Sequence, residues 1–273
     1  AMQLVKRISR QRGLTFVEVL IGLVVGVIVI GGAITVYASS VQSSNNTLRT
    51  SRLNQEVAGL MLVMTNDIRR AGYWENATAG QFQLNPFSQP GATTLQVRDN
   101  MTNDAAQPPT GQGSCITYAY DATYLGGNAP AVVDDTDLFG FRLNGGVVQM
   151  RQSGTVDGAA CVGGTCNSCV NGTWANVTDA NLIEVTALNF DLSNSACLNA
   201  AEPNLVDDNT DGVIDDDAEY NCYVTVPTVG SGTATAESRE VRITVTARLA
   251  NDITTQATTT QTVTVRNDVI QIR

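Results

Sequence analysis

The sequence predicts an α+β protein in which a long N-terminal hydrophobic α-helix packs on a disulfide-stapled antiparallel β-sheet domain. Three observations support this fold class. No charged residue occurs from Val19 to Leu48, an apolar repeat of helical period follows, and the rest of the chain alternates short β-rich segments with turn residues. We expect three parts: a cleaved leader at 1–13, the helix at 14–72 and a globular head at 73–273.

The absence of histidine and the acidic charge exclude several functions. The 273 residues include no His and carry a formal net charge of −10. Without an imidazole, the chain has no Ser-His-Asp or Cys-His site and no His-ligated metal. An acidic surface repels nucleic-acid phosphates, so direct nucleic-acid binding is not expected. We therefore expect a protein that is not an enzyme.

The distribution of charge predicts a membrane anchor. The leader has no acidic residue, and its basic residues are Lys6, Arg7, Arg10 and Arg12. With four of the 16 basic residues in the leader and all 26 acidic residues after it, residues 14–273 carry a net charge of −14. An apolar helix of about twenty residues spans a bilayer, and its positive flank stays in the cytoplasm. We expect the head to reach an oxidising compartment, where its cysteines form disulfides.

Two residues distinguish this segment from a secretory signal and from a plain anchor. A secretory signal has its small cleavage residues after the apolar core, whereas Gly13 stands before it. Glu18 places an ionisable side chain inside the apolar segment, which is costly in lipid unless the carboxylate meets a positive partner. We therefore expect Glu18 to be functional; the alternative is an accidental glutamate in a plain anchor.

The run from Arg10 to Ile21 resembles the prepilin signal of type IV pilins and of the pseudopilins of type II secretion. The resemblance lies in Arg-Gln-Arg-Gly followed by Leu-Thr-Phe-Val-Glu-Val-Leu-Ile. It implies that a membrane prepilin peptidase and N-methyltransferase cuts after Gly13 and methylates Leu14. It also implies that Glu18 pairs with the N-terminal amine of a neighbouring subunit.

The helix is expected to continue beyond the membrane to about Ala71. Apolar residues recur at steps of three and four, as on one face of a helix, at Leu53, Val57, Leu60, Met64, Ile68 and Ala71. Polar residues fill the other faces, and Gly72 is a typical helix stop. A coiled-coil stalk is the weaker alternative, because the repeat lasts under three heptads.

The end of this helix carries a second resemblance. Residues Asn66 to Trp74 resemble the Asp-Ile-Arg-x-Ala-Gly-Tyr segment that ends the long helix in the large minor pilins called PilW, which correspond to the J-type pseudopilins of type II secretion. The resemblance is strong over residues 10–75 and thin beyond them. It implies a pilin-like fold.

Short β-rich segments fill the head between clusters of turn residues. The expected strands are Thr94 to Arg98, Cys115 to Tyr120, Leu138 to Leu143, Val147 to Arg151, Leu182 to Leu192, Tyr220 to Val226, Glu240 to Leu249 and Gln261 to Val265. Two Gly-Gly pairs, Gly145-Gly146 and Gly163-Gly164, have the composition of tight hairpin turns.

The six cysteines allow fifteen disulfide connectivities. If Gly163 and Gly164 form a turn, Cys161 and Cys166 face each other across the hairpin within disulfide reach. Cys115 would then join Cys169, and Cys197 would join Cys222. A redox role for Cys166-x-x-Cys169 is an alternative, but no thioredoxin-like βαβ pattern surrounds it. A Cys-only zinc site is less favoured outside the cytoplasm.

An acidic stretch between Cys197 and Cys222 has the ligand spacing of a calcium loop. Counted from Asp207, side-chain oxygens fall at positions 1, 3, 5 and 9, with a glycine at position 6 and a backbone carbonyl at position 7, as in an EF-hand loop. Position 12 is Ala218, so the closing ligand has to come from Asp217 or Glu219. No helix pair flanks the stretch, which makes it similar to the stand-alone loops of dockerins and thrombospondin repeats.

A solvated acidic turn is the alternative to a calcium site. Six Asp lie between residues 207 and 217, and their mutual repulsion favours a bound cation. The expected cofactor is Ca²⁺, and the expected ligands are Asp207, Asn209, Asp211, Val213 through its carbonyl, Asp215, and Asp217 or Glu219.

The resemblance implies a minor pilin that takes part in priming and assembly of type IV pili, in a tip complex that supports twitching motility, adhesion or DNA uptake. Its partners would be other minor pilins, the major pilin, a tip adhesin and the prepilin peptidase. It would reside in the bacterial inner membrane as a single-pass protein and then in the pilus outside the cell. Two alternatives remain open: a J-type pseudopilin of type II secretion, and a calcium-binding surface adhesin with a pilin-like anchor.

Overall fold

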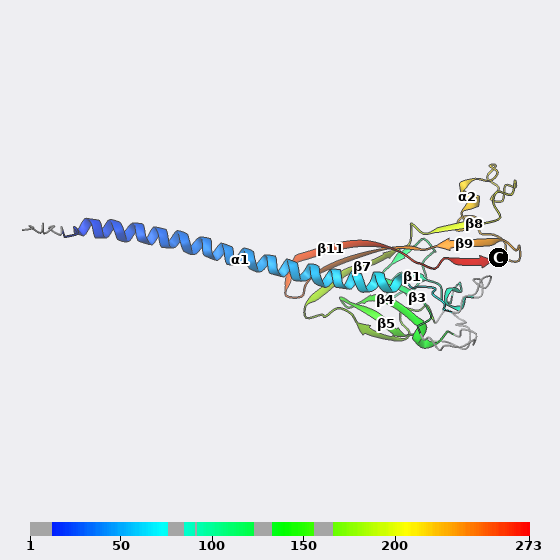
Figure 1. The fold of residues 1–273 in the computed structure, drawn as a ribbon, viewed down its shortest axis with the longest axis horizontal. Helices are drawn as coiled ribbons and strands as arrows, with labels where there is room; N and C mark the ends of the chain where they lie inside the picture. Colours follow the sequence, from blue (N-terminus) through cyan, green and yellow to red (C-terminus); the bar gives the residue numbers. More distant parts are fainter. Residues whose placement is uncertain (1–12, 76–84, 91, 123–132, 156–165) are drawn as a thin grey trace, which may run out of the picture. The chain divides into compact units, whose positions relative to one another are not determined.

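The computed structural model describes residues 13–75, 85–90, 92–122, 133–155 and 166–273 (Figure 1). The chain divides into two compact units, Ala1–Arg49 and Thr50–Arg273. Residues 1–12 of the expected leader and the expected Gly163-Gly164 turn with Cys161 lie outside the described residues.

The first major element is helix α1, Phe16–Ile68. Its N-terminal part is apolar and exposed, and α1 is the helix among the described residues that is long and apolar enough to cross a membrane. The helix starts two residues later than expected because Thr15 serves as its N-cap, and it ends three residues early. After Ile68 the chain turns, and Gly72 takes the left-handed conformation with φ of +72°, which a residue with a side chain rarely adopts.

The C-terminal part of α1 buries the predicted apolar face. All six expected positions are at most 3% exposed, and they are Leu53, Val57, Leu60, Met64, Ile68 and Ala71. They share one hydrophobic core with strands of two sheets, including Tyr118, Phe141 and Val245. This stripe is therefore covered by the head of the same chain, unlike the apolar residues before Arg49.

The strands in the described part of the head form three antiparallel sheets. The five-stranded sheet has the order β1-β3-β4-β5-β6 and consists of Gln96–Arg98, Cys115–Ala119, Leu138–Asn144, Val147–Ser153 and Thr173–Asn176. The four-stranded sheet has the order β11-β10-β7-β2 and consists of Asp252–Thr264, Glu240–Leu249, Ile183–Asp191 and Gln112–Gly113.

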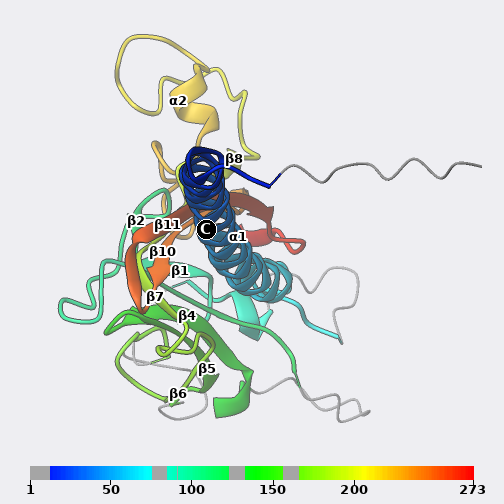
Figure 2. The same cartoon turned by 90° about the vertical axis from the view of Figure 1, so that its left-hand side faces the viewer.

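The three-stranded sheet has the order β12-β9-β8 and consists of Val269–Ile272, Ala234–Ser238 and Ala196–Asn199. Among its described residues, the head also contains the 3₁₀ turns η2, Pro86–Ser88, and η3, Asp135–Asp137, and the short helix α2, Asp217–Tyr220. The acidic segment between β8 and α2 extends outward from the sheets in both views (Figures 1 and 2).

Several strand predictions are confirmed. β10 has the expected bounds, and its Val241, Ile243 and Val245 are fully buried between outward-facing neighbours. The β4–β5 hairpin turns at Gly145 and Gly146, whose φ values of +58° and +81° are those of a type I′ turn.

The predicted strand from Tyr220 to Val226 is wrong. Asn221 turns the chain there: its side chain accepts a hydrogen bond from the Tyr223 amide at 3.0 Å, and its carbonyl accepts one from the Val224 amide at 2.9 Å. Asn commonly forms such turns, which compete with strand pairing.

The predicted strand from Gln261 to Val265 was too short, because β11 already starts at Asp252. Threonine hydroxyls pair across the outer face of β10 and β11, with Thr244 and Thr260 3.1 Å apart and Thr246 and Thr258 3.0 Å apart. Threonine is β-branched and suits strands despite its polarity, which explains the underestimate.

Two of the expected disulfides join described cysteines. Cys115 bonds to Cys169 and Cys197 bonds to Cys222, with Cα atoms 6.4 and 5.1 Å apart. Cys166 is also disulfide-bonded, and its expected partner Cys161 lies outside the described residues. Because Cys169 pairs with Cys115, the Cys166-x-x-Cys169 spacing is not a redox-type internal disulfide.

Candidate processing, helix-docking and metal-ligand sites

The predicted processing site lies in an open stretch before α1. Gly13, Leu14 and Thr15 are exposed and precede the helix. A Cβ atom at Gly13 would meet no other atom within 4 Å, and its φ is not in the left-handed range. The fold of this chain therefore does not itself require glycine at position 13.

Glu18 caps the start of α1 together with Thr15. The Glu18 carboxylate oxygen Oε2 accepts hydrogen bonds from the Thr15 amide at 3.0 Å and the Thr15 hydroxyl at 3.1 Å. The Thr15 hydroxyl oxygen in turn accepts a hydrogen bond from the Glu18 amide at 3.3 Å. This reciprocal arrangement is a capping box, which satisfies helix amides that have no partner within the helix. The Thr-x-x-Glu spacing could have revealed this role of Thr15 in the sequence.

The helix that follows exposes apolar side chains over its first unit. Phe16, Leu23 and Ile28 are between 62% and 79% exposed, and the most apolar 18-residue stretch of α1 contains no buried residue. A helix that is hydrophobic on all sides is normally buried in lipid or against other protein and is not left exposed to water. The described part of the chain does not cover this apolar surface, so lipid or another protein chain has to cover it.

At the other end of α1, Asp67 docks the helix onto β3. Its carboxylate accepts hydrogen bonds from the Tyr118 hydroxyl at 2.5 Å and from the Tyr120 hydroxyl at 2.8 Å. Burial raises the pKa of both tyrosines above the usual value, and the negative charge of Asp67 raises it further. Both hydroxyls therefore remain protonated donors at neutral pH.

The residues after Asp67 complete this docking site. The Arg70 guanidinium lies 4.1 Å from the centre of the Tyr120 ring, and Tyr120 stacks on Phe139 with ring centres 3.9 Å apart. The Gly72 amide donates to the Ala119 carbonyl at 2.8 Å. The segment that resembles PilW pilins thus joins the end of α1 to the five-stranded sheet. Sequence reasoning assigned Asp67 no role, because its tyrosine partners are about fifty residues away.

The first half of the predicted calcium loop is held by its own side chains. Asp207 accepts hydrogen bonds from the amides of Asp211 and Gly212 at 3.1 and 2.8 Å. Asn209 accepts one from the Asp211 amide, and Asp211 accepts one from the Val213 amide. These predicted ligands therefore stabilise the turns of the loop, and they do not lie in the cluster of carboxylates described next.

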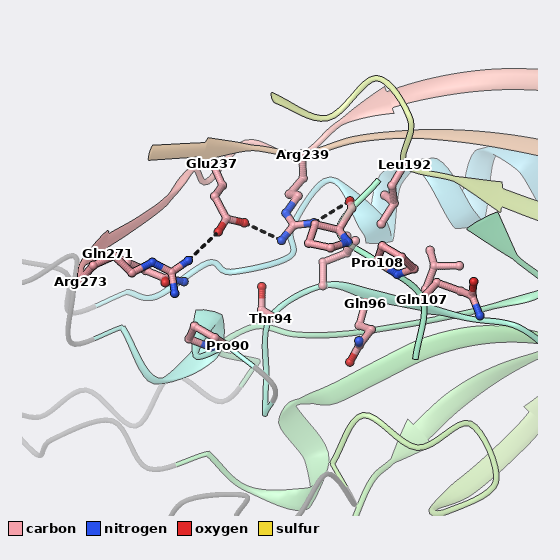
Figure 3. Close-up of a pocket in the computed structure, with 13 residues that line it drawn as sticks. Pro90, Thr94, Gln96, Gln107, Pro108, Leu192, Glu237, Arg239, Gln271 and Arg273 are labelled. Atoms are coloured by element: carbon pink, nitrogen blue, oxygen red, sulfur yellow. Dashed lines mark hydrogen bonds and ion pairs between the residues drawn. The ribbon is translucent and has the colours of Figure 1, made fainter. Parts of the chain in front are cut away.

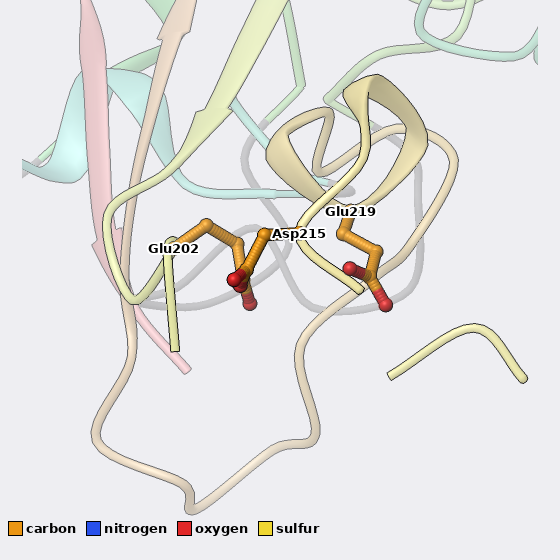
Figure 4. A group of neighbouring side chains, drawn as sticks. All are labelled: Glu202, Asp215 and Glu219. Carbon is orange, nitrogen blue, oxygen red and sulfur yellow. The ribbon is translucent and has the colours of Figure 1, made fainter. Parts of the chain in front are cut away.

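That cluster consists of Glu202, Asp215 and Glu219, whose ligand oxygens lie within 4.8 Å of one another (Figure 4). Glu202 follows β8, Asp215 belongs to the acidic segment, and Glu219 lies in α2 and is fully buried. Ligands on opposite sides of a Ca²⁺ ion are about 4.8 Å apart, so three such oxygens fit one coordination sphere.

The cluster includes two of the predicted ligands and one residue that was missed. Asp217, one of the two candidates for the closing ligand, instead lines a separate hollow with Tyr220 and Asn221. Glu202 was missed because it precedes the motif and reaches the cluster through the fold alone. Burial, followed by hydrogen bonding with Asp208 and Asp215, raises the pKa of Glu202.

These features define the class of pilin-like proteins: a prepilin-type N-terminus, one exposed apolar helix and an antiparallel β head. The chain belongs to the family described as prepilin peptidase-dependent protein B, whose model matches residues 46–265. Residues 8–34 match the prokaryotic N-terminal methylation motif. The chain is thus a prepilin-peptidase-dependent protein of the minor pilin and pseudopilin class, and its apolar helix fits a membrane-anchored pilin.

One curated relative supports this assignment. The pilin-like protein PilA3 of Thermus thermophilus is 30% identical over 94 residues, which are 34% of this chain and 40% of that protein. The chain therefore spans less than half the length of this relative. No solved structure gave a significant match.

Proposed function

We propose that this protein is a minor pilin that primes and supports assembly of type IV pili, in a complex at the pilus tip. The observation that carries the proposal is the exposed, uncharged part of α1, which begins within the stretch that matches the methylation motif. Such a helix is stable in the inner membrane, and helices of other pilin subunits cover it equally well in a filament. The protein would therefore work by packing rather than by catalysis.

Processing would precede assembly. A prepilin peptidase would cut after Gly13 and methylate the amine of Leu14. Because the fold leaves open space at Gly13, a requirement for glycine there would come from recognition by the peptidase. The exposed stretch from Gly13 to Thr15 precedes the helix and would give the peptidase access to the backbone.

Glu18 would then have two separate tasks. Its Oε2 atom caps the helix through Thr15, while Oε1 makes no hydrogen bond within the described part of the chain. The second oxygen would accept the N-terminal amine of a neighbouring subunit, which would compensate the cost of a carboxylate at membrane depth. This pairing would set the register between neighbouring helices.

More specifically, we assign the protein to the PilW type of minor pilin. Its partners would be other minor pilins, the major pilin and a tip adhesin. The structural support for this assignment is the docking site at Asp67 and Gly72, which fits the resemblance at the end of the helix. A J-type pseudopilin of type II secretion would use the same anchor and fold. The two differ in the phenotype that follows deletion.

Deletion and complementation test this proposal. We expect a deletion strain to lose surface pili and twitching while it keeps type II secretion, and we expect the intact gene to restore pili. Immunogold labelling of sheared filaments should place the head at filament ends. Loss of secretion with normal pili would identify the pseudopilin instead, and piliated cells that fail to adhere would favour the adhesin.

We propose calcium binding at the acidic segment as a second property, supported by the grouping of Glu202, Asp215 and Glu219. A bound cation would offset repulsion among these carboxylates and order the segment closed by the Cys197–Cys222 disulfide. A calcium-ordered segment that projects from the sheets would suit contact with a neighbouring subunit or a surface.

A further inference from the structure

A cavity of about 180 Å³ lies in the head between the loops around β1 and the strands β9 and β12 (Figure 3). Three charged side chains line it: Glu237, Arg239 and Arg273. Pro108 and Leu192 contribute apolar surface to the wall of the cavity, and Thr94 and Gln271 contribute polar groups. The pilin-like features described above do not use this cavity.

The positive charge in the wall exceeds the negative charge. Arg239, only 6% exposed, donates through Nη2 to Glu237 at 2.5 Å and through Nη1 to the Pro109 carbonyl at 3.0 Å. Arg273 approaches the other Glu237 oxygen only to 3.9 Å. One carboxylate side chain thus faces two guanidinium groups, which leaves the side chains of this partly buried wall with a net charge of about +1.

Hydrogen-bond donors in this wall also lack partners. Within the described residues, the buried Nε atoms of Arg239 and Arg273 have no hydrogen-bond partner, and the Arg273 guanidinium makes no hydrogen bond. The Thr94 hydroxyl and the Gln271 amide also make none there, and Figure 3 shows the Thr94 side chain directed toward the space beneath Glu237 and Arg239. The two Nε donors are buried, so the lack of a partner is costly for them, whereas the partly exposed Thr94 and Gln271 are available to donate to a bound acceptor.

From the net positive charge of the wall and its hydrogen-bond donors without partners, we infer that this cavity binds a carboxylate group. This group would be carried by a small aliphatic molecule or by the end of a peptide chain. A monoanion balances the net side-chain charge of the wall, whereas a dianion such as sulfate would leave an uncompensated negative charge beside Glu237. Arg273 and Thr94 hold the two carboxylate oxygens, and Pro108 and Leu192 contact the attached carbon chain. The volume admits a ligand of only a few carbon atoms. This inference goes beyond the assembly role and does not depend on it.

Binding to the full-length chain in detergent micelles tests the inference. Propionate represents a free small acid, N-acetylglycine represents a peptide terminus, and sulfate at equal ionic strength is the dianion control. We expect saturable calorimetric binding of at least one carboxylate and none of sulfate. Binding of propionate alone would indicate a free acid, and binding of N-acetylglycine alone would indicate a chain terminus.

Three variants locate the site. Arg273→Gln should weaken binding about tenfold, because it removes a charged donor, and Thr94→Val should weaken it severalfold. Arg266→Gln is the matched control, since Arg266 is exposed and lies outside the cavity. Unchanged melting without ligand shows that each variant is folded. Absence of saturable binding, or equal affinity in Arg273→Gln, Thr94→Val and the unaltered chain, would overturn the inference.

Discussion

The carboxylate of Asp67, near the C-terminal end of α1, accepts a hydrogen bond from the hydroxyl of Tyr118 in β3. Tyr118 is 2% exposed, so its hydroxyl has little access to water as an alternative partner. Tyr120 donates to the second oxygen of the same carboxylate. The end of the long helix is therefore attached to the five-stranded sheet by polar contacts as well as by its apolar stripe.

We expect Tyr118→Phe to lower the free energy of unfolding by about 2 kcal/mol, because a hydrogen bond to a charged group is lost in a buried setting. Tyr73→Phe is the matched control, since Tyr73 is 41% exposed and should change stability little. Urea unfolding followed by circular dichroism measures both. Equal midpoints for the two variants would show that the Asp67 contact contributes nothing.

Alkaline pH should destabilise the protein through the same tyrosines. The pKa of Tyr118 and of Tyr120 is raised in the folded state by burial and by Asp67, whereas an unfolded tyrosine titrates near pH 10. The contribution of these groups is therefore complete below about pH 10 and is lost as pH rises toward the folded pKa values. The fall in stability above pH 10 should be shallower in Tyr120→Phe. If the free energy of unfolding fell equally steeply with pH in Tyr120→Phe and in the unaltered protein, Tyr120 would not be a source of this pH dependence.

Processing should leave Leu14 as the first residue, with a methylated amine. Mass spectrometry of the protein from a peptidase-competent strain measures this directly, and a strain without the peptidase is the control. Gly13→Ala should retain the leader, although it leaves the fold unchanged because a Cβ atom at this position meets no other atom within 4 Å. An intact leader in the competent strain would refute the processing site.

Substitutions at Glu18 and Thr15 should separate helix capping from subunit pairing. Glu18→Gln keeps an acceptor for the capping box but removes the charge, so membrane insertion should persist while incorporation into pili falls severalfold. Thr15→Ala removes the cap, at a cost of about 1 kcal/mol, but keeps the charge. Immunoblots of membranes and sheared filaments measure both. Normal incorporation of Glu18→Gln would rule out charge pairing.

Calcium should raise the melting temperature of the protein. A dissociation constant near 10 μM in about 1 mM calcium would add about 2.7 kcal/mol, which corresponds to a shift of roughly 5 °C or more. Asp215→Asn should abolish the shift because Asp215 lies in the carboxylate cluster, whereas Asp217→Asn should retain it. Identical melting temperatures in calcium and in chelator, with no heat of binding, would show that the segment is a plain acidic turn that binds no calcium.

Local patterns predicted much of this fold. The stripe from Leu53 to Ala71, the Gly145-Gly146 turn and the alternation in β10 all follow from side-chain periodicity and backbone freedom within a few residues. The structure of the segment from Tyr220 to Val226 could not be predicted in this way, because a side-chain turn at Asn221 overrode its strand propensity. The extent of β11 depended on threonine pairs with β10, which a hydrophobic pattern does not record.

The sequence by itself determined the prepilin-type start, the exposed apolar helix and the helical stripe, because each depends on residues that are close together in the chain. Tertiary structure alone decided which distant groups meet. It placed Asp67 against Tyr118 and Tyr120, added Glu202 to the carboxylate cluster, and gathered Glu237, Arg239 and Arg273 around a cavity. Hydrogen bonds and charges act over only a few ångströms, so residues far apart in sequence acquire these roles only when sheet pairing brings them together.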